Sequence, residues 1–140
     1  MNHEISYKVV KRLAAAEGYL ELELPQAALS ELNRIGDAGP FNAIEQLLRG
    51  EALTGLSQFD EAIEPLKKAA DLFPAPMNRR AWASLSKCYA STGQDSLANE
   101  ALVASQTEVA SQGQPGVIVQ VVMQPIFTAV LGNQVRQIQR

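Results

Sequence analysis

The sequence has few of the residues that carry out chemistry or cross-link a chain. It contains one cysteine, Cys88, and one histidine, His3. A single cysteine cannot form an intramolecular disulfide, so we expect a reducing compartment. Neither residue has neighbours in the sequence that would activate it or give it metal-ligand spacing, and no glycine-rich phosphate loop occurs. The sequence therefore predicts a protein that is not an enzyme and that uses no metal or cofactor.

Long apolar runs and excess positive charge are also missing. No stretch of the 140 residues approaches the roughly 18 apolar residues that a membrane-spanning helix needs, and the N-terminus lacks the apolar run of a signal peptide. The net charge of -3 provides no general positive field that would collect phosphates. We expect a cytoplasmic protein that does not bind nucleic acid, with one main domain at this length.

What the sequence does contain is a helical pattern, clearest in residues 58–74, QFDEAIEPLKKAADLFP. Apolar side chains recur there every three or four residues from Phe59 to Phe73, which is the spacing of one helix face. Acidic residues occupy the first half and lysines the second, as a helix dipole favours, and Pro74 ends the pattern. This apolar face needs a partner helix.

The pattern repeats along the chain. Pro74 follows Pro40 by 34 residues, and four further columns recur with spacings of 34 and then 36 residues. These columns are Ala28, Ala62 and Ala98; Leu32, Leu66 and Leu102; Ala16, Gly50 and Ser86; and Tyr19, Leu53 and Tyr89. Residues 1–112 are therefore predicted to form three helix pairs, at about 6–40, 41–76 and 77–111. The helices are expected at 6–22 and 26–35, 41–55 and 59–72, and 77–91 and 95–111, with Pro25 and Pro40 in first turns.

These columns resemble the tetratricopeptide repeat (TPR) family over about residues 9–111. AWASLSKCYASTGQDSLANEAL (81–102) is similar to the family's first-helix pattern, and GEALTGLSQFDEAIEPLKKAADLFP (50–74) to its second-helix pattern. AEGYLELELPQAALSELNRIGDAGP (16–40) is a weaker copy. Arg12 and Gln46 stand where the family favours tryptophan. The resemblance implies an all-α fold, a right-handed TPR superhelix of three helix pairs with an extra C-terminal helix.

The resemblance also implies a groove that binds another protein and is lined by the first helix of each pair. Its wall is expected at Leu13, Glu17, Leu20 and Glu21, then Leu47, Glu51 and Thr54, then Arg80, Ala83, Ser84 and Lys87. This order predicts a groove that is acidic at one end, apolar in the middle and basic at the other. Leu13 and Glu17 replace the lysine and asparagine with which chaperone-binding members hold a C-terminal carboxylate. The alternative interpretation is a solvated face without a partner.

Residues 113–140 form a second region, an apolar tail. After Glu108 the chain has no acidic residue. A β-branched run, VIVQVV at 117–122, precedes a predicted helix at 125–140. The apolar stripe of that helix consists of Ile126, Phe127, Val130, Leu131, Val135 and Ile138. Three interpretations stay open: a helix that caps the repeats, self-association by exchange of the tail between two copies, and an anchor on a membrane surface or partner.

The predicted function is that of a scaffold or adaptor that binds a segment of another protein. In size and repeat number the chain is similar to the bacterial kinesin-light-chain-like TPR proteins that accompany bacterial tubulins. That resemblance implies a cytoskeletal tubulin filament as partner. The alternatives are a co-chaperone or assembly factor for a secretion or pilus system, and a peripheral membrane protein that is linked to the membrane by its tail.

Overall fold

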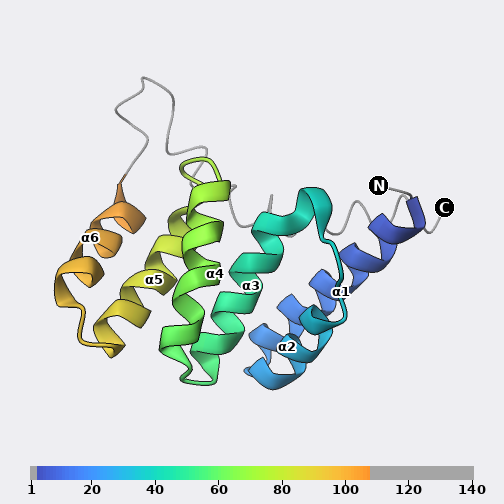
Figure 1. Cartoon of the computed structure of the whole chain (residues 1–140), viewed down its shortest axis with the longest axis horizontal. Helices are drawn as coiled ribbons and strands as arrows, with labels where there is room; N and C mark the ends of the chain where they lie inside the picture. The colour runs from blue at the N-terminus through green and yellow to red at the C-terminus, as the bar shows by residue number, and fades with distance from the viewer. Residues whose placement is uncertain (1–2, 108–140) are drawn as a thin grey trace.

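A computed structural model describes residues 3–107, which form six α-helices and one short 3-10 helix (Figure 1). The elements are α1 (His3–Glu21), α2 (Pro25–Asn33), η1 (Gly39–Phe41), α3 (Asn42–Gly55), α4 (Phe59–Leu72), α5 (Arg79–Ser91) and α6 (Asp95–Gln106). Within this stretch no strand forms. The all-α prediction is confirmed, and the observed bounds of α4 are those expected.

The helix ends differ from the prediction by a few residues, among them the start of α3 and the end of α6. Pro25 is the first residue of α2 as expected, but Pro40 lies in η1 and not in the first turn of α3. Gly39 begins η1 with a φ of 55°, and its N–H donates to Oδ1 of Asp37 at 2.8 Å. Glycine accepts this left-handed backbone, so the chain turns before α3 and the helix begins later. At the other end α6 stops at Gln106, and residues 108–111 lie outside the described part.

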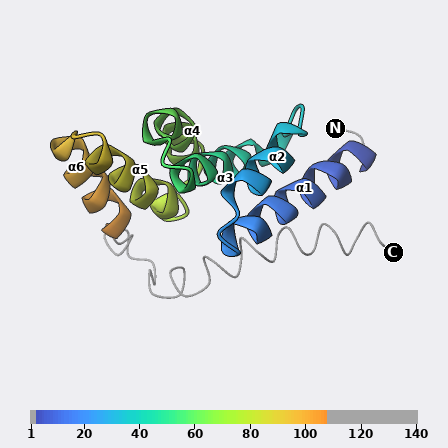
Figure 2. The same ribbon diagram turned by 90° about the horizontal axis from the view of Figure 1, so that it is seen from below.

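The helices pack as three consecutive pairs. The most extensive contacts join α3 to α4 and α5 to α6, and α1 packs on α2. The pairs are joined through α2 on α3 and α4 on α5, and the α4–α5 contact is slightly more extensive than that between α1 and α2. Helices α1, α3 and α5 also contact one another in sequence, whereas α2, α4 and α6 make no comparable contacts among themselves within residues 3–107. The first helices of the pairs therefore form a continuous row, and the array extends in one direction (Figure 2).

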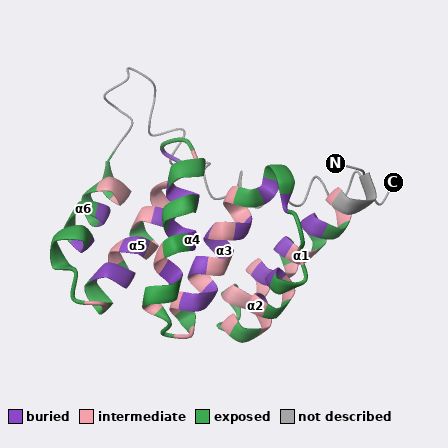
Figure 3. Ribbon diagram, viewed as in Figure 1, coloured by how far each residue is buried: buried purple, intermediate pink, exposed green. Residues whose placement is uncertain are grey.

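Two cores hold the array together, and α3 contributes to both. One core contains residues of α1, α2 and α3, including Leu13 and Leu48, and the other runs from α3 to α6 and includes Leu47 and Leu66. Leu47 and Leu48 are 1% and 0% exposed, so neighbouring leucines of α3 enter different cores. The buried residues in Figure 3 accordingly lie on both sides of α3. A helix that is buried on two sides stabilises the junction between the first and second pairs.

Candidate functional site

The row of first helices presents one surface, which we call the odd-helix face. It consists of the partly or fully exposed residues predicted for the groove wall, namely Glu17, Leu20 and Glu21 of α1, Glu51 and Thr54 of α3, and Arg80, Ala83, Ser84 and Lys87 of α5. Leu13 and Leu47 do not belong to it. Both are buried, at 0% and 1% exposure, and they pack in the two cores. The prediction that they line the wall is corrected, since a partner cannot reach them.

Arg80 connects all three helices of the odd-helix face. Its Nε and Nη2 donate to the two carboxylate oxygens of Glu51 at 2.7 and 2.6 Å, which is a bidentate ion pair. Its Nη1 donates to Oε1 of Glu17 at 3.2 Å. A side chain of the third pair thus reaches both the second pair and the first. The three side chains are 13–28% exposed, so solvent screens this network only in part.

This network corrects the charge order that the sequence predicts. Glu17 and Arg80 were expected at opposite ends of the face, but they are in contact, because the long arginine side chain crosses α3. One guanidinium faces two carboxylates, so the network keeps one negative charge. Glu21 on α1 and Lys87 on α5 are exposed at either side of it. The face is therefore still more acidic toward α1 and more basic toward α5. The difference is smaller than the sequence predicts, because Arg80 of α5 is paired with Glu17 and Glu51.

Burial and hydrogen bonding have opposite effects on the pKa values of Glu17 and Arg80. Partial burial raises the pKa of Glu17 above its ordinary value, and the hydrogen bond and charge of Arg80 offset that rise only in part. For Arg80, burial alone would lower the pKa, but the hydrogen bonds and charges of Glu51 and Glu17 outweigh it and raise the pKa. Arg80 therefore remains a cation, while the ionised form of Glu17 is destabilised by its loss of water.

Thr54 and Cys88 meet beneath the face. Thr54 Oγ1 donates to the carbonyl oxygen of Gly50 at 2.8 Å and lies 3.2 Å from Cys88 Sγ. Cys88 is 0% exposed, and burial raises the pKa of its thiol, although Thr54 and Lys87 oppose the rise. A buried thiol with a raised pKa is a poor nucleophile. Among residues 3–107, no group of three or more histidine, cysteine or acidic side chains gathers that could hold a metal ion.

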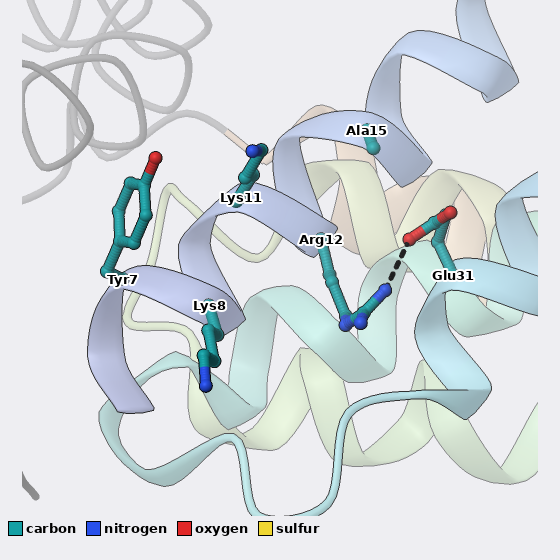
Figure 4. Close-up of a pocket in the computed structure, with 6 residues that line it drawn as sticks. All are labelled: Tyr7, Lys8, Lys11, Arg12, Ala15 and Glu31. Atoms are coloured by element: carbon teal, nitrogen blue, oxygen red, sulfur yellow. Dashed lines mark hydrogen bonds and ion pairs between the residues drawn. The ribbon is translucent and has the colours of Figure 1, made fainter. Parts of the chain in front are cut away.

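A second feature, a hollow on α1, was not predicted from the sequence. It is lined by Tyr7, Lys8, Lys11, Arg12 and Ala15 together with Glu31 of α2 (Figure 4). Arg12 Nη1 donates to Glu31 Oε2 at 3.0 Å, and Lys11 Nζ lies 5.9 Å from the ring centre of Tyr7. The spacing of Lys8, Lys11, Arg12 and Ala15 could have revealed a basic helix side. Arg12 pairs α1 with α2 through its ion pair with Glu31.

The residues of the predicted tail stripe, Ile126, Phe127, Val130, Leu131, Val135 and Ile138, lie outside the described part of the chain. The described helices include none that is both long and apolar enough to cross a membrane. Comparisons of the chain with protein-family models, with curated proteins and with solved structures gave no match in any of the three.

Proposed function

We propose that the protein is a non-enzymatic scaffold whose odd-helix face binds an extended segment of another protein. The observation that carries the proposal is the continuous row of α1, α3 and α5, linked across its surface by Arg80. A surface shared by three helix pairs is long enough to hold a peptide, and its preformed ion pairs reduce the entropy lost on binding.

The finer architecture belongs to this proposal. Three consecutive helix pairs with five repeating columns support a right-handed TPR-type superhelix. Because, within residues 3–107, the first helices of the pairs contact one another more extensively than the second helices do, the array should curve with the odd-helix face on its inner side. The face would then be the concave groove of the superhelix, where a partner segment buries more area than it would on a flat surface.

The charge distribution on the face indicates the orientation of the partner segment. Glu21 and the negatively charged Glu17–Arg80–Glu51 network lie toward α1, and Lys87 lies on α5. A partner should therefore place its basic side chains beside α1 and its acidic ones beside α5. A bacterial tubulin-type filament is the partner class implied by the resemblance, in size and repeat number, to the bacterial kinesin-light-chain-like TPR proteins. Co-sedimentation of the chain with such a filament tests that part of the proposal separately.

Site-specific photo-crosslinking in cells tests the function. A photoreactive amino acid replaces Ala83 or Lys87, which are exposed on α5, and in matched controls it replaces Lys67 or Lys68, which are exposed on α4. We expect discrete crosslinked products with another protein from the first two positions only. Equal crosslinking from both helices, or products from α4 alone, would contradict the proposal.

Affinity measurements then sharpen the result. Once mass spectrometry identifies the crosslinked segment, its synthetic peptide is titrated against the intact protein and against Lys87→Glu and Lys68→Glu variants. Lys87→Glu should weaken binding and change its dependence on salt concentration, and Lys68→Glu should do neither. If the captured protein belongs to a secretion or pilus system, the assembly-factor alternative replaces the filament partner, with the same binding face.

A further inference from the structure

We propose that the chain's own C-terminal segment, residues 117–140, packs on the odd-helix face and runs from α5 toward α1. The proposal concerns the same surface as the proposed function, but it requires no external partner. It is carried by three observations: where the segment is attached, how long it is, and in what order charges occur on the segment and on the face.

The point of attachment sets the direction. The segment follows α6, which packs on α5 at one end of the array, and α1 lies at the other end (Figure 1). Residues 108–116 could span up to about 30 Å if extended. Residues 117–138 would span about 33 Å even as a continuous helix. Three helices packed side by side extend over only about 20 Å, so the segment is long enough to reach α1.

The order of charges fits this direction and not the reverse. Beyond Glu108 the only charged side chains are Arg136 and Arg140, both close to the C-terminal end. A segment that starts near α5 brings these arginines to α1, where Glu21 is exposed and the Glu17–Arg80–Glu51 network has an excess negative charge. The reverse direction would place both arginines beside Lys87. The uncharged residues 117–135 would then cover the middle of the face, where Thr54 and Ser84 are only half-buried.

A segment in this position would compete with an external ligand, and this consequence does rest on the proposed function. The tail would then match the partner in one respect, because both would carry basic side chains at the α1 end of the face. Binding of such a partner would require displacement of the tail, and the tail would act as an intramolecular inhibitor.

Photo-crosslinking within the intact chain tests the proposal. The photoreactive residue replaces Gln120 in one variant and Gln137 in another, and each is irradiated as a mixture of unlabelled and ¹⁵N-labelled protein. We expect Gln120 variants to crosslink to α5 near Ala83 and Lys87, and Gln137 variants to α1 near Glu21, within one chain. Crosslinks to the exposed Leu102 and Val103 of α6, a reversed order, mixed-label products, or no crosslink to residues 3–107 would each overturn it.

A charge exchange provides a second, independent readout. Glu21→Lys should lower the yield of the Gln137 crosslink to α1 about two- to fivefold, the range expected for an exposed ion pair. Adding Arg136→Glu should restore the yield. Asp71→Lys, the same charge change at an exposed position of α4, is the matched control and should have no effect. Equal loss in both lysine variants, or no rescue, would contradict the proposal. Crosslinking of an external protein from Ala83 is scored separately, so the two proposals can fail independently.

Discussion

Leu66 and Leu102 occupy the same position in the second and third helix pairs, yet only one of them is buried. Leu66 is 0% exposed and Leu102 is 44% exposed. The difference arises because α4 packs between α3 and α5, whereas α6 packs on α5 alone among the described helices. The repeat places both leucines at the same position of the second helix, but the number of helices packed around that helix determines how far each leucine is buried.

The small residues at the two helix crossings differ in a related way. At the second pair, Gly50 is packed so closely against Leu66 that a Cβ on the glycine would overlap the Cγ of the leucine. At the third pair, Ser86 Oγ donates a hydrogen bond to the carbonyl oxygen of Ala98 at 2.8 Å. The inner pair is therefore closed by van der Waals contact, and the terminal pair by a hydrogen bond.

The largest effect should follow from Leu66→Ala. The substitution removes a fully buried side chain from the core that runs from α3 to α6, and we expect a loss of about 2–5 kcal/mol in the free energy of unfolding. Urea denaturation followed by circular dichroism measures it. A loss below about 1 kcal/mol would mean that the second pair is not packed on both sides.

Gly50→Ala tests the close crossing itself. Overpacking against Leu66 should cost about 1–3 kcal/mol, partly offset by the roughly 1 kcal/mol that alanine gains over glycine inside a helix. In the Leu66→Ala background the same substitution fills vacated space, so it should stabilise. The critical result of this double-mutant cycle is that Gly50→Ala destabilises the wild type but stabilises the Leu66→Ala variant. If the losses from the two substitutions simply add, Gly50 and Leu66 are not in close contact.

Ser86→Ala tests the corresponding crossing of the third pair. Loss of the hydrogen bond to Ala98 should lower the free energy of unfolding by about 0.5–1.5 kcal/mol. The higher helix propensity of alanine should offset a small part of that loss. Ser84→Ala, on the same helix but half-buried on the odd-helix face, is the control and should not destabilise. A larger effect of Ser86→Ala than of Gly50→Ala would reverse the proposed difference between the two crossings.

The local features of the fold could be predicted from the sequence because they depend on short-range patterns. The three-and-four spacing from Phe59 to Phe73 and the breaker Pro74 were sufficient to place α4. The 34- and 36-residue periods were sufficient to pair the helices. By contrast η1 depends on the positive φ of Gly39 and on a hydrogen bond to Asp37, which no periodicity reveals.

The candidate site was less predictable because it depends on the reach of long side chains. Helical position placed Glu17, Glu51 and Arg80 on one face, but not the contact between Arg80 and Glu17, which are 63 residues apart. Nor could it separate Leu13 and Leu47, which are buried, from their exposed neighbours, since the width of each helix's buried side depends on how neighbouring pairs are rotated. The hollow on α1 likewise needs the ion pair of Arg12 with Glu31 of another helix.

The link between the first and third pairs predicts a pH-dependent effect of Glu17→Gln. Because partial burial raises the pKa of Glu17 in the folded state, the native protein holds that proton more tightly than the unfolded chain. The contribution of Glu17 to stability is therefore full below the ordinary carboxyl pKa and is lost as pH rises through the raised pKa. Relative to the wild type, Glu17→Gln should gain stability as pH rises from the ordinary carboxyl pKa through the raised pKa, measured by urea denaturation. A constant difference at every pH would contradict this assignment.

The smallest effect is expected for Leu102→Ala, and it also tests what covers the end of the array. A leucine that is 44% exposed loses only part of its burial on truncation, so the cost should be about 0.5–1 kcal/mol, well below that of Leu66→Ala. If residues 117–140 pack on the odd-helix face as proposed, removing residues 113–140 should leave this small cost unchanged. If the tail instead covers α6, Leu102 would be buried in the intact chain. The Leu102→Ala substitution should then cost about 2 kcal/mol or more in the intact chain and less once the tail is removed.

Melting temperatures at two protein concentrations should be equal for a tail bound within its own chain and should fall on dilution for a tail exchanged between copies. A membrane anchor would be indicated if the intact chain, and not the shortened one, floats with liposomes that contain anionic lipid.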